Sequence, residues 1–191
     1  MHMTRQNNKT PALMLDFDNC LIHSLLATDQ QDADALIEQY SELWRGEKFR
    51  ISDGWYVTFL RGFSEELLSF SRQLLGNDNV YALSTGTNDY ITSINHVLEL
   101  GFDPNTNMFG REDIYGCYKH PRFECTHNIL IDNEDWWFHS DSKHCKVKFL
   151  NNLPESQLIQ VPAFDVNYGK EYLGDFMDDL KLKIVEAFFK S

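Results

Sequence analysis

The segment Leu13-Met14-Leu15-Asp16-Phe17-Asp18-Asn19 decides the fold, because a short apolar run ends there in two aspartates. Apolar runs of this length are typical of buried strands. A second run, 129–131, ends in the same way at Asp132 and Asn133. The carboxyl ends of parallel strands meet at one edge of an open α/β sheet, where such folds bind ligands. The two runs therefore predict a cluster of three carboxylates and one amide, whose charge favours a bound Mg²⁺.

Strand and helix patterns alternate along the rest of the chain. Apolar runs predict core strands over 13–17, 80–83, 129–131 and 158–161. Helical spacing and capping residues predict a helix over 32–44, with Gly46 just past its end as a stop. They also predict helices from Ser64 to a stop at Gly76, from Thr87 to a stop at Gly101, and over 171–189. Asp53-Gly54 between β-rich flanks predicts a hairpin over 48–59. This alternation predicts an α/β fold with a mostly parallel sheet flanked by helices.

The composition restricts the classes of partner. There are 17 basic residues against 29 acidic ones, which gives a net charge of −12. Nonspecific nucleic-acid binding depends on Lys and Arg side chains that neutralise phosphates, so we expect no nucleic-acid partner. No apolar stretch is long enough to span a membrane. Residues 1–11 lack the apolar core of a signal peptide. We therefore expect no membrane partner and an intracellular location, cytoplasmic or nuclear.

The sequence also indicates the state of the cysteines and the extent of the domain. There are four cysteines, Cys20, Cys117, Cys125 and Cys145, and no two of them form a CxxC pair. We expect reduced thiols rather than a zinc site. Residues 1–11 are expected to be a loose tail, and 12–191 are expected to form a single domain.

The order of the motifs resembles the haloacid dehalogenase superfamily of aspartate-dependent phosphotransferases. A strand with Asp-x-Asp, a strand with Ser84-Thr85-Gly86, a lysine, and a strand with Asp132-Asn133 follow one another. The closer resemblance is to the small phosphatases that act on the RNA polymerase II C-terminal domain, the FCP/SCP or NLI-interacting-factor-like group. That group opens with DLDETLVHS, and this chain reads DFDNCLIHS over 16–24.

Four further segments are similar to motifs of the same family, namely 58–63, 83–90, 108–112 and 132–139. The chain departs from the family pattern at Asn19-Cys20, at Gly62 and at Glu134-Asp135. The family has Glu-Thr, Pro and Ser-Pro at these places. The family's lysine is best matched by Lys119, with a shorter spacing to the second strand-end aspartate.

The resemblance implies a Rossmann-like fold of the haloacid dehalogenase type and a role for the aspartates. Asp16 would be the nucleophile that forms an aspartyl-phosphate, and Asp18 would be the general acid and base. Mg²⁺ would be held by the Asp16 carboxylate, the Asp18 backbone carbonyl and Asn133. Asp132 would not bind the metal directly, and it would orient Asn133 or pair with Lys119.

The resemblance also implies how the phosphate is bound. Thr85 and Gly86 at the start of a helix would bind a phosphate oxygen. Lys119 would offset the charge of the phosphoryl group. Arg111 is the alternative, either for that role or for a second group of the substrate.

Residues 25–58 are expected to form a small insert with one helix and one hairpin after the first strand, not a large cap domain. An open site of this kind favours a phosphoprotein or another bulky phosphoester as substrate. Asp32, Asp34 and Glu38 stand in the insert. Acidic side chains along a groove would repel a multiply phosphorylated peptide.

The leading function is therefore a Mg²⁺-dependent Ser/Thr phosphoprotein phosphatase. One alternative is a phosphatase of small molecules or nucleotides, in which the insert closes as a lid. Another is a pseudophosphatase that binds partners through the same face. The intact Asp16 and Asp18 argue against a pseudophosphatase, and the replacement of Glu-Thr by Asn19-Cys20 keeps it open.

Overall fold

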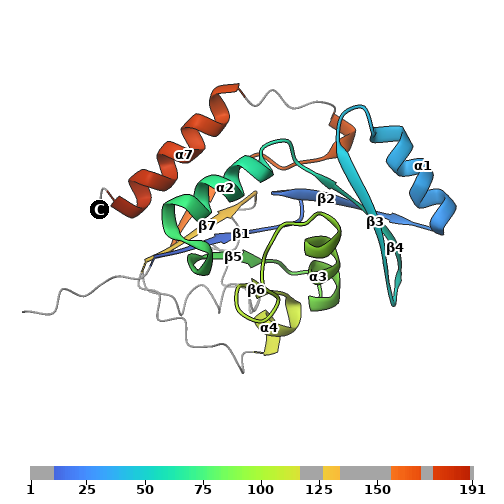
Figure 1. Ribbon diagram of the computed structural model, residues 1–191, viewed down its shortest axis with the longest axis horizontal. Coiled ribbons are helices and arrows are strands. Elements are labelled where there is room, and N and C mark those ends of the chain that lie inside the picture. Colours follow the sequence, from blue (N-terminus) through green and yellow to red (C-terminus); the bar gives the residue numbers. More distant parts are fainter. Residues whose placement is uncertain (1–10, 117–126, 134–155, 169–173, 190–191) are drawn as a thin grey trace, which may run out of the picture.

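The centre of the protein is a five-stranded parallel sheet in the order β6-β5-β1-β7-β8 (Figure 1). We describe it from a computed structural model that places residues 11–116, 127–133, 156–168 and 174–189. The strands of this sheet are β1 (Pro11–Leu15), β5 (Val80–Leu83), β6 (Met108–Phe109), β7 (His127–Asp132) and β8 (Ser156–Gln160). The prediction of an α/β fold with a mostly parallel sheet flanked by helices is confirmed.

A second, antiparallel sheet has the order β2-β4-β3. Its strands are β2 (Ile22–Ala27), β3 (Arg45–Ile51) and β4 (Gly54–Leu60). The helices are α1 (Gln30–Tyr40), α2 (Ser64–Leu75), α3 (Asn88–Val97), α4 (Arg111–Gly116) and α7 (Gly174–Phe189). Short 3-10 turns, η1 (Asn77–Asn79) and η2 (Val166–Tyr168), lie between these elements. None of the helices in the described residues has both the length and the apolar character that a membrane crossing demands.

Alternate residues of β1 point to opposite faces of the parallel sheet, as strand geometry requires. Leu13 and Leu15 belong to the main core, which the sheet shares with α2, α3 and α7. Ala12 and Met14, on the other face, are also completely buried. Burial on both faces explains why β1 is an unbroken apolar run rather than an alternating one.

The order of the strands reverses at β1. The next core strands along the chain, β5 and β6, lie on one side of β1, whereas β7 and β8 lie on the other. Open α/β sheets bind ligands outside the carboxyl ends of the strands at such a switch point. The Asp16 N–H donates to the carbonyl of Ile131 over 3.0 Å, so the ends of β1 and β7 are joined there. The topology therefore points to the edge of the sheet where the sequence motifs lie.

Several local predictions are confirmed. Strand 80–83 is β5 with the same bounds. The Thr87 side chain caps α3 by accepting the Tyr90 N–H over 3.3 Å. The hairpin around Asp53-Gly54 is formed by β3 and β4. The last helix begins in the described residues at Gly174.

Other local predictions are wrong. The first strand ends at Leu15 and not at Phe17, because the chain turns directly after it. Pro11 belongs to β1 and not to the tail. Ser64 is the first residue of α2 rather than its cap, and its hydroxyl donates to the carbonyl of Leu21 over 2.7 Å.

The insert over 25–58 differs most from expectation, because it belongs to a three-stranded sheet rather than to a helix and a hairpin alone. Strand β2 was not predicted, and neither was β6 in the central sheet. The helix predicted over 32–44 ends at Tyr40, and Gly46 lies within β3. A Cβ atom at Gly46 would lie 2.5 Å from Cε1 of Phe59, so the glycine allows this close approach and does not end a helix.

The two faces of the small sheet pack against different parts of the protein. Val57 and Phe59 face a cluster that contains Ala33 of α1. Phe49 and Tyr56 point to the other face and contact Tyr90 of α3. Helix α1 and the carboxyl edge of the parallel sheet are therefore on opposite sides of the small sheet.

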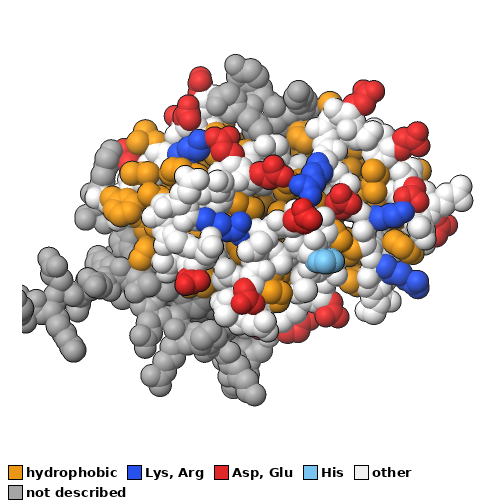
Figure 2. Space-filling view, in the orientation of Figure 1, with side chains coloured by type: hydrophobic (Ala, Val, Ile, Leu, Met, Phe, Trp, Pro, Cys, Tyr) orange, Lys and Arg blue, Asp and Glu red, His pale blue; other side chains and the backbone are white. Residues whose placement is uncertain are grey.

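This arrangement corrects the expectation of an acidic groove. Asp32 and Asp34 lie on α1, where Asp32 accepts from Thr28 and Asp34 pairs with Lys48. Glu38 lies on the same helix. Figure 2 shows acidic side chains spread over the visible face, with basic side chains among them.

Candidate active site

The turn that follows β1 is held by its own backbone. The Phe17 carbonyl accepts the N–H groups of Cys20, Leu21 and Ile22, over 3.2, 2.9 and 2.9 Å. The Asn19 N–H donates back to the Ile22 carbonyl over 2.8 Å. Asn19 has a φ of 60°, in the left-handed region that asparagine tolerates better than most residues. These bonds fix the backbone on both sides of Asp18.

A buried arginine that lies outside the turn stabilises it through hydrogen bonds. Arg61 is only 2% exposed, and its Nη1 donates to the carbonyls of Cys20 (3.0 Å) and Pro162 (2.7 Å). Its guanidinium also lies 4.5 Å from the centroid of the Phe63 ring. The Phe164 N–H donates to the Asn19 carbonyl over 2.7 Å. The turn is therefore tied to the segment that follows β8, far along the chain.

The loop between β5 and α3 supplies the second part of the site. The Ser84 hydroxyl accepts the Gly86 N–H over 3.0 Å, which folds the loop back on itself. Arg111 binds the loop twice, because its N–H donates to the Gly86 carbonyl (2.7 Å) and its Nε donates to the Thr85 carbonyl (2.9 Å). A Cβ atom at Gly86 would lie 2.5 Å from Cδ1 of Tyr90. Gly86 is thus required for close packing of the loop on α3.

A pocket of about 270 Å³ brings these parts together. Four residues that the sequence singles out line it, namely Asp18, Thr85, Gly86 and Arg111. The remaining lining residues were not predicted as site residues, and they are Ile51, Asp53, Tyr56, Thr87 and Tyr90. Ile51, Asp53 and Tyr56 come from the hairpin of the small sheet. One wall of the pocket is therefore made by the insert.

The other predicted residues lie at the ends of β1 and β7 or outside the described residues. Asp16 follows β1 directly and is 7% exposed, whereas Asp132 ends β7 and is 1% exposed. Asn133 is half-buried, and its carbonyl accepts from Nε2 of Gln160 over 3.2 Å. Lys119 lies outside the described residues, so its assigned role stays a prediction.

The oxygen donors at this edge suit a hard cation. The predicted ligands are one carboxylate side chain (Asp16), one backbone carbonyl (Asp18) and one amide (Asn133), all of which offer the oxygen atoms that Mg²⁺ prefers. Within the described ranges, no three His, Cys, Asp or Glu side chains gather into a metal cluster. The proposed set does not need such a cluster, because only one of its donors is a carboxylate side chain.

Tyr90 is the site residue whose role the sequence least revealed. Its hydroxyl donates to Oδ1 of Asp18 over 2.6 Å. Burial and the negative charge of Asp18 raise the pKa of Tyr90 far above its ordinary value of 10.0, so the hydroxyl keeps its proton. The position of Tyr90 in the first turn of α3 is the one local sign that it faces the strand ends.

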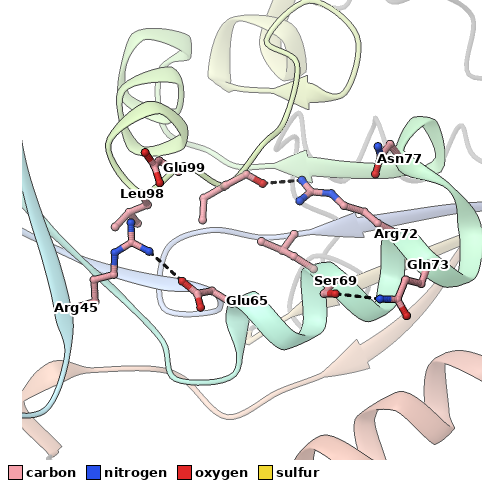
Figure 3. A pocket seen from close by; sticks show the side chains of 10 residues that line it. Arg45, Glu65, Ser69, Arg72, Gln73, Asn77, Leu98 and Glu99 are labelled. Atoms are coloured by element: carbon pink, nitrogen blue, oxygen red, sulfur yellow. Dashed lines mark hydrogen bonds and ion pairs between the residues drawn. The ribbon is translucent and has the colours of Figure 1, made fainter.

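A larger pocket of about 540 Å³ lies elsewhere, between α2 and the turn after α3 (Figure 3). Its two arginines already have partners within the protein. Arg45 binds Glu65 over 2.9 Å, and Arg72 donates to the Leu100 carbonyl over 2.6 Å. Burial lowers the pKa of Arg72. No residue of the predicted constellation lines this pocket, so we place the candidate active site at the smaller one.

Comparison with known proteins gives a distant likeness. No protein-family model matches the chain, and no curated protein matches it. Among solved structures, the chain is similar to an arginine-to-alanine variant of the fission yeast RNA polymerase II CTD phosphatase Fcp1, bound to beryllium fluoride. The TM-score is 0.47 and the sequence identity is 14%, over 92% of this chain and 50% of that one. The chain thus spans about half the length of that structure, and the assignment of a function rests on the residues of the site.

Proposed function

We propose that this protein is a Mg²⁺-dependent phosphatase that hydrolyses phosphomonoesters through an aspartyl-phosphate on Asp16. One observation supports this most strongly. Residues that the sequence selects from three separate segments, Asp18, Thr85-Gly86 and Arg111, line a single pocket. Asp18 belongs to the turn after β1, the strand at which the order of the sheet reverses, and Asp132 ends the adjacent strand β7.

The proposed reaction has two steps. In the first, a carboxylate oxygen of Asp16 attacks phosphorus, and the bond between phosphorus and the ester oxygen breaks. Asp18 donates a proton to the leaving oxygen, which departs as an alcohol. In the second step, water attacks the phosphorus of the acyl phosphate and gives its proton to Asp18. Inorganic phosphate leaves, and the Asp16 carboxylate is restored.

The negative charges at this edge require compensation. The hydroxyl of Thr85 would bind a phosphate oxygen, and the Arg111 guanidinium would supply a positive charge beside it. The Gly86 N–H already donates to the Ser84 hydroxyl, so Gly86 would act by shaping the loop. Mg²⁺, held by Asp16, the Asp18 carbonyl and Asn133, would supply further positive charge for the phosphoryl group. Lys119, the cation that the resemblance implies, would offset the same charge, and Arg111 is the alternative to it.

A Ser/Thr phosphoprotein is the proposed substrate class. The insert contributes one wall of the pocket, with Ile51, Asp53 and Tyr56, and not a large lid. A side chain that projects from a peptide could enter such a pocket while the rest of the peptide stays outside. The acids of α1 do not oppose this, because they lie on the other side of the small sheet.

A panel of substrates tests the proposal. Rates of phosphate release would be compared for phosphoserine and phosphothreonine peptides and for nucleoside monophosphates, each with Mg²⁺ and with a chelator. We expect a kcat/KM at least about tenfold higher for the peptides, and no turnover with the chelator. Faster turnover of the nucleotides would replace the protein substrate with a small-molecule one. Undiminished turnover with the chelator would contradict the role of Mg²⁺.

A further inference from the structure

Tyr90 and Asp18 are 72 residues apart in the sequence, yet a hydrogen bond of 2.6 Å joins their side chains. Asp18 is half-buried within the turn after β1, and Tyr90 lies in the first turn of α3. The bond therefore joins two of the three segments that form the pocket. Both residues also line the pocket itself.

The ring of Tyr90 is fixed by its neighbours. Its centroid lies 5.8 Å from that of Phe49 and 5.4 Å from that of Tyr56, and the planes are tilted by 56° and 67°. Phe49 and Tyr56 stack on each other, with centroids 5.4 Å apart. Gly86 lies against the same ring, where even a methyl group would collide. A hydroxyl on a ring held in this way has little freedom to leave Asp18.

We propose that Tyr90 is a positioning residue for catalysis, which holds the carboxyl group of Asp18 in the direction needed for proton transfer. This inference rests on the proposed function. A hydrogen bond to Oδ1 fixes the rotation of the carboxyl group about its bond to Cβ, and hence the direction of Oδ2. A general acid is effective only when its proton points at the leaving oxygen.

Two other polar side chains of the pocket, Tyr56 and Arg111, form hydrogen bonds with groups other than Asp18. The other charged or titratable side chains of the pocket are Asp53 and Tyr56 from the hairpin and Arg111 from α4, and Asp16 precedes Asp18 in the turn. The hydroxyl of Tyr56 donates to Asp53 over 3.0 Å. The Arg111 Nε donates to the Thr85 carbonyl over 2.9 Å. The Tyr90 hydroxyl, by contrast, donates to the proposed general acid.

The test is Tyr90→Phe, which keeps the ring and removes the hydroxyl, assayed on aryl and alkyl phosphates whose leaving groups differ in basicity. A weakly basic leaving group departs without a proton, whereas an alkoxide needs one. We expect kcat/KM, which reports only the step in which the leaving group departs, to fall about tenfold or more for alkyl phosphates and by less than about twofold for the most activated aryl phosphate. Tyr40→Phe is the matched control, because that hydroxyl also makes a 2.6 Å bond, to Oδ1 of Asn167, away from the pocket.

A double variant shows whether Tyr90 acts through Asp18. In an Asp18→Asn background, which lacks the acid, Tyr90→Phe should cause no further loss on alkyl phosphates. An equal loss for every leaving group, or an undiminished loss in the Asp18→Asn background, would overturn the positioning role while the proposed function stands. If the folded parent protein hydrolyses none of the esters, the proposed function fails and the positioning role fails with it.

Discussion

Asn19 and Arg61 show how single residues prepare the candidate site without touching a substrate. Asn19 stands where the FCP/SCP family, which the chain resembles, has glutamate. Its φ is positive, which explains why asparagine is suited to this turn. Its side chain oxygen also lies 3.0 Å from Nδ1 of His23. Arg61 is a buried cation whose hydrogen bonds reach two carbonyls from distant segments. The shape of the turn that carries Asp18 therefore depends on residues on either side of it.

Replacing Arg61 tests this dependence. Arg61→Met keeps a long side chain but leaves the buried carbonyls of Cys20 and Pro162 without their donor. We expect the free energy of unfolding to fall by about 3 kcal/mol and turnover to fall with it. Urea unfolding measures the loss of stability, and a phosphatase assay measures the loss of turnover. The control is Arg50→Met, since Arg50 is exposed on the small sheet and its loss should cost about 0.5 kcal/mol. Equal losses for the two variants would show that Arg61 has no special role.

At the scale of elements, the sequence correctly predicts those strands and helix ends whose conformation depends on neighbouring residues in the chain. Strand β5 and the cap of α3 follow from an apolar run and from Thr87. Strand β2 could not be predicted in this way, because its residues 22–27 alternate only weakly and its pairing partner is β4, about thirty residues later. Gly46 misled the prediction for a related reason. Its conformation is set by contact with Phe59 in the neighbouring strand, which no local pattern reveals.

The cap of α1 is a local feature that can be tested apart from the site. The Asp29 side chain accepts the Asp32 N–H over 2.9 Å at the start of the helix. Asp29→Ala should lower the free energy of unfolding by about 1 kcal/mol, whereas Asp29→Asn should nearly retain it. Phosphatase activity should not change in either variant, because α1 covers the face of the small sheet away from the pocket. A loss of activity at unchanged stability would contradict this placement.

The turn at Asp165 gives a prediction for acid stability. The Asn167 N–H, which donates to Asp165 over 2.9 Å, together with the Asn167 side chain and His23, holds the pKa of Asp165 below its ordinary value of 3.8. A lowered pKa means that this carboxylate stabilises the fold above pH 3.8, and that the contribution is lost as the pH falls below that value. Asp165→Asn should therefore cost more stability at pH 6 than at pH 3, in urea unfolding at both pH values. A difference that does not vary with pH would contradict the assignment.

At the scale of the whole molecule, the topology explains why motifs far apart in the sequence meet. Strands β5, β1 and β7 are adjacent and parallel, so the residues that follow them share one edge. The sequence could predict this meeting, because the end of each strand is marked by a change from apolar to polar residues. It could not predict the wall from Ile51 and Tyr56 or the bond between Tyr90 and Asp18. Both depend on how the small sheet packs against α3, which involves contacts between distant segments.

The central claim is that Asp16 is the nucleophile of a Mg²⁺-dependent phosphatase. Its most direct test is the hydrolysis of para-nitrophenyl phosphate by the parent protein and by Asp16→Asn, with and without Mg²⁺. Asp103→Asn serves as the control, because Asp103 is exposed and does not line the pocket. We predict Mg²⁺-dependent turnover in the parent and the control, and a loss of at least about a thousandfold in Asp16→Asn. Turnover by folded Asp16→Asn at the parent's rate, or no turnover by the folded parent, would contradict the account.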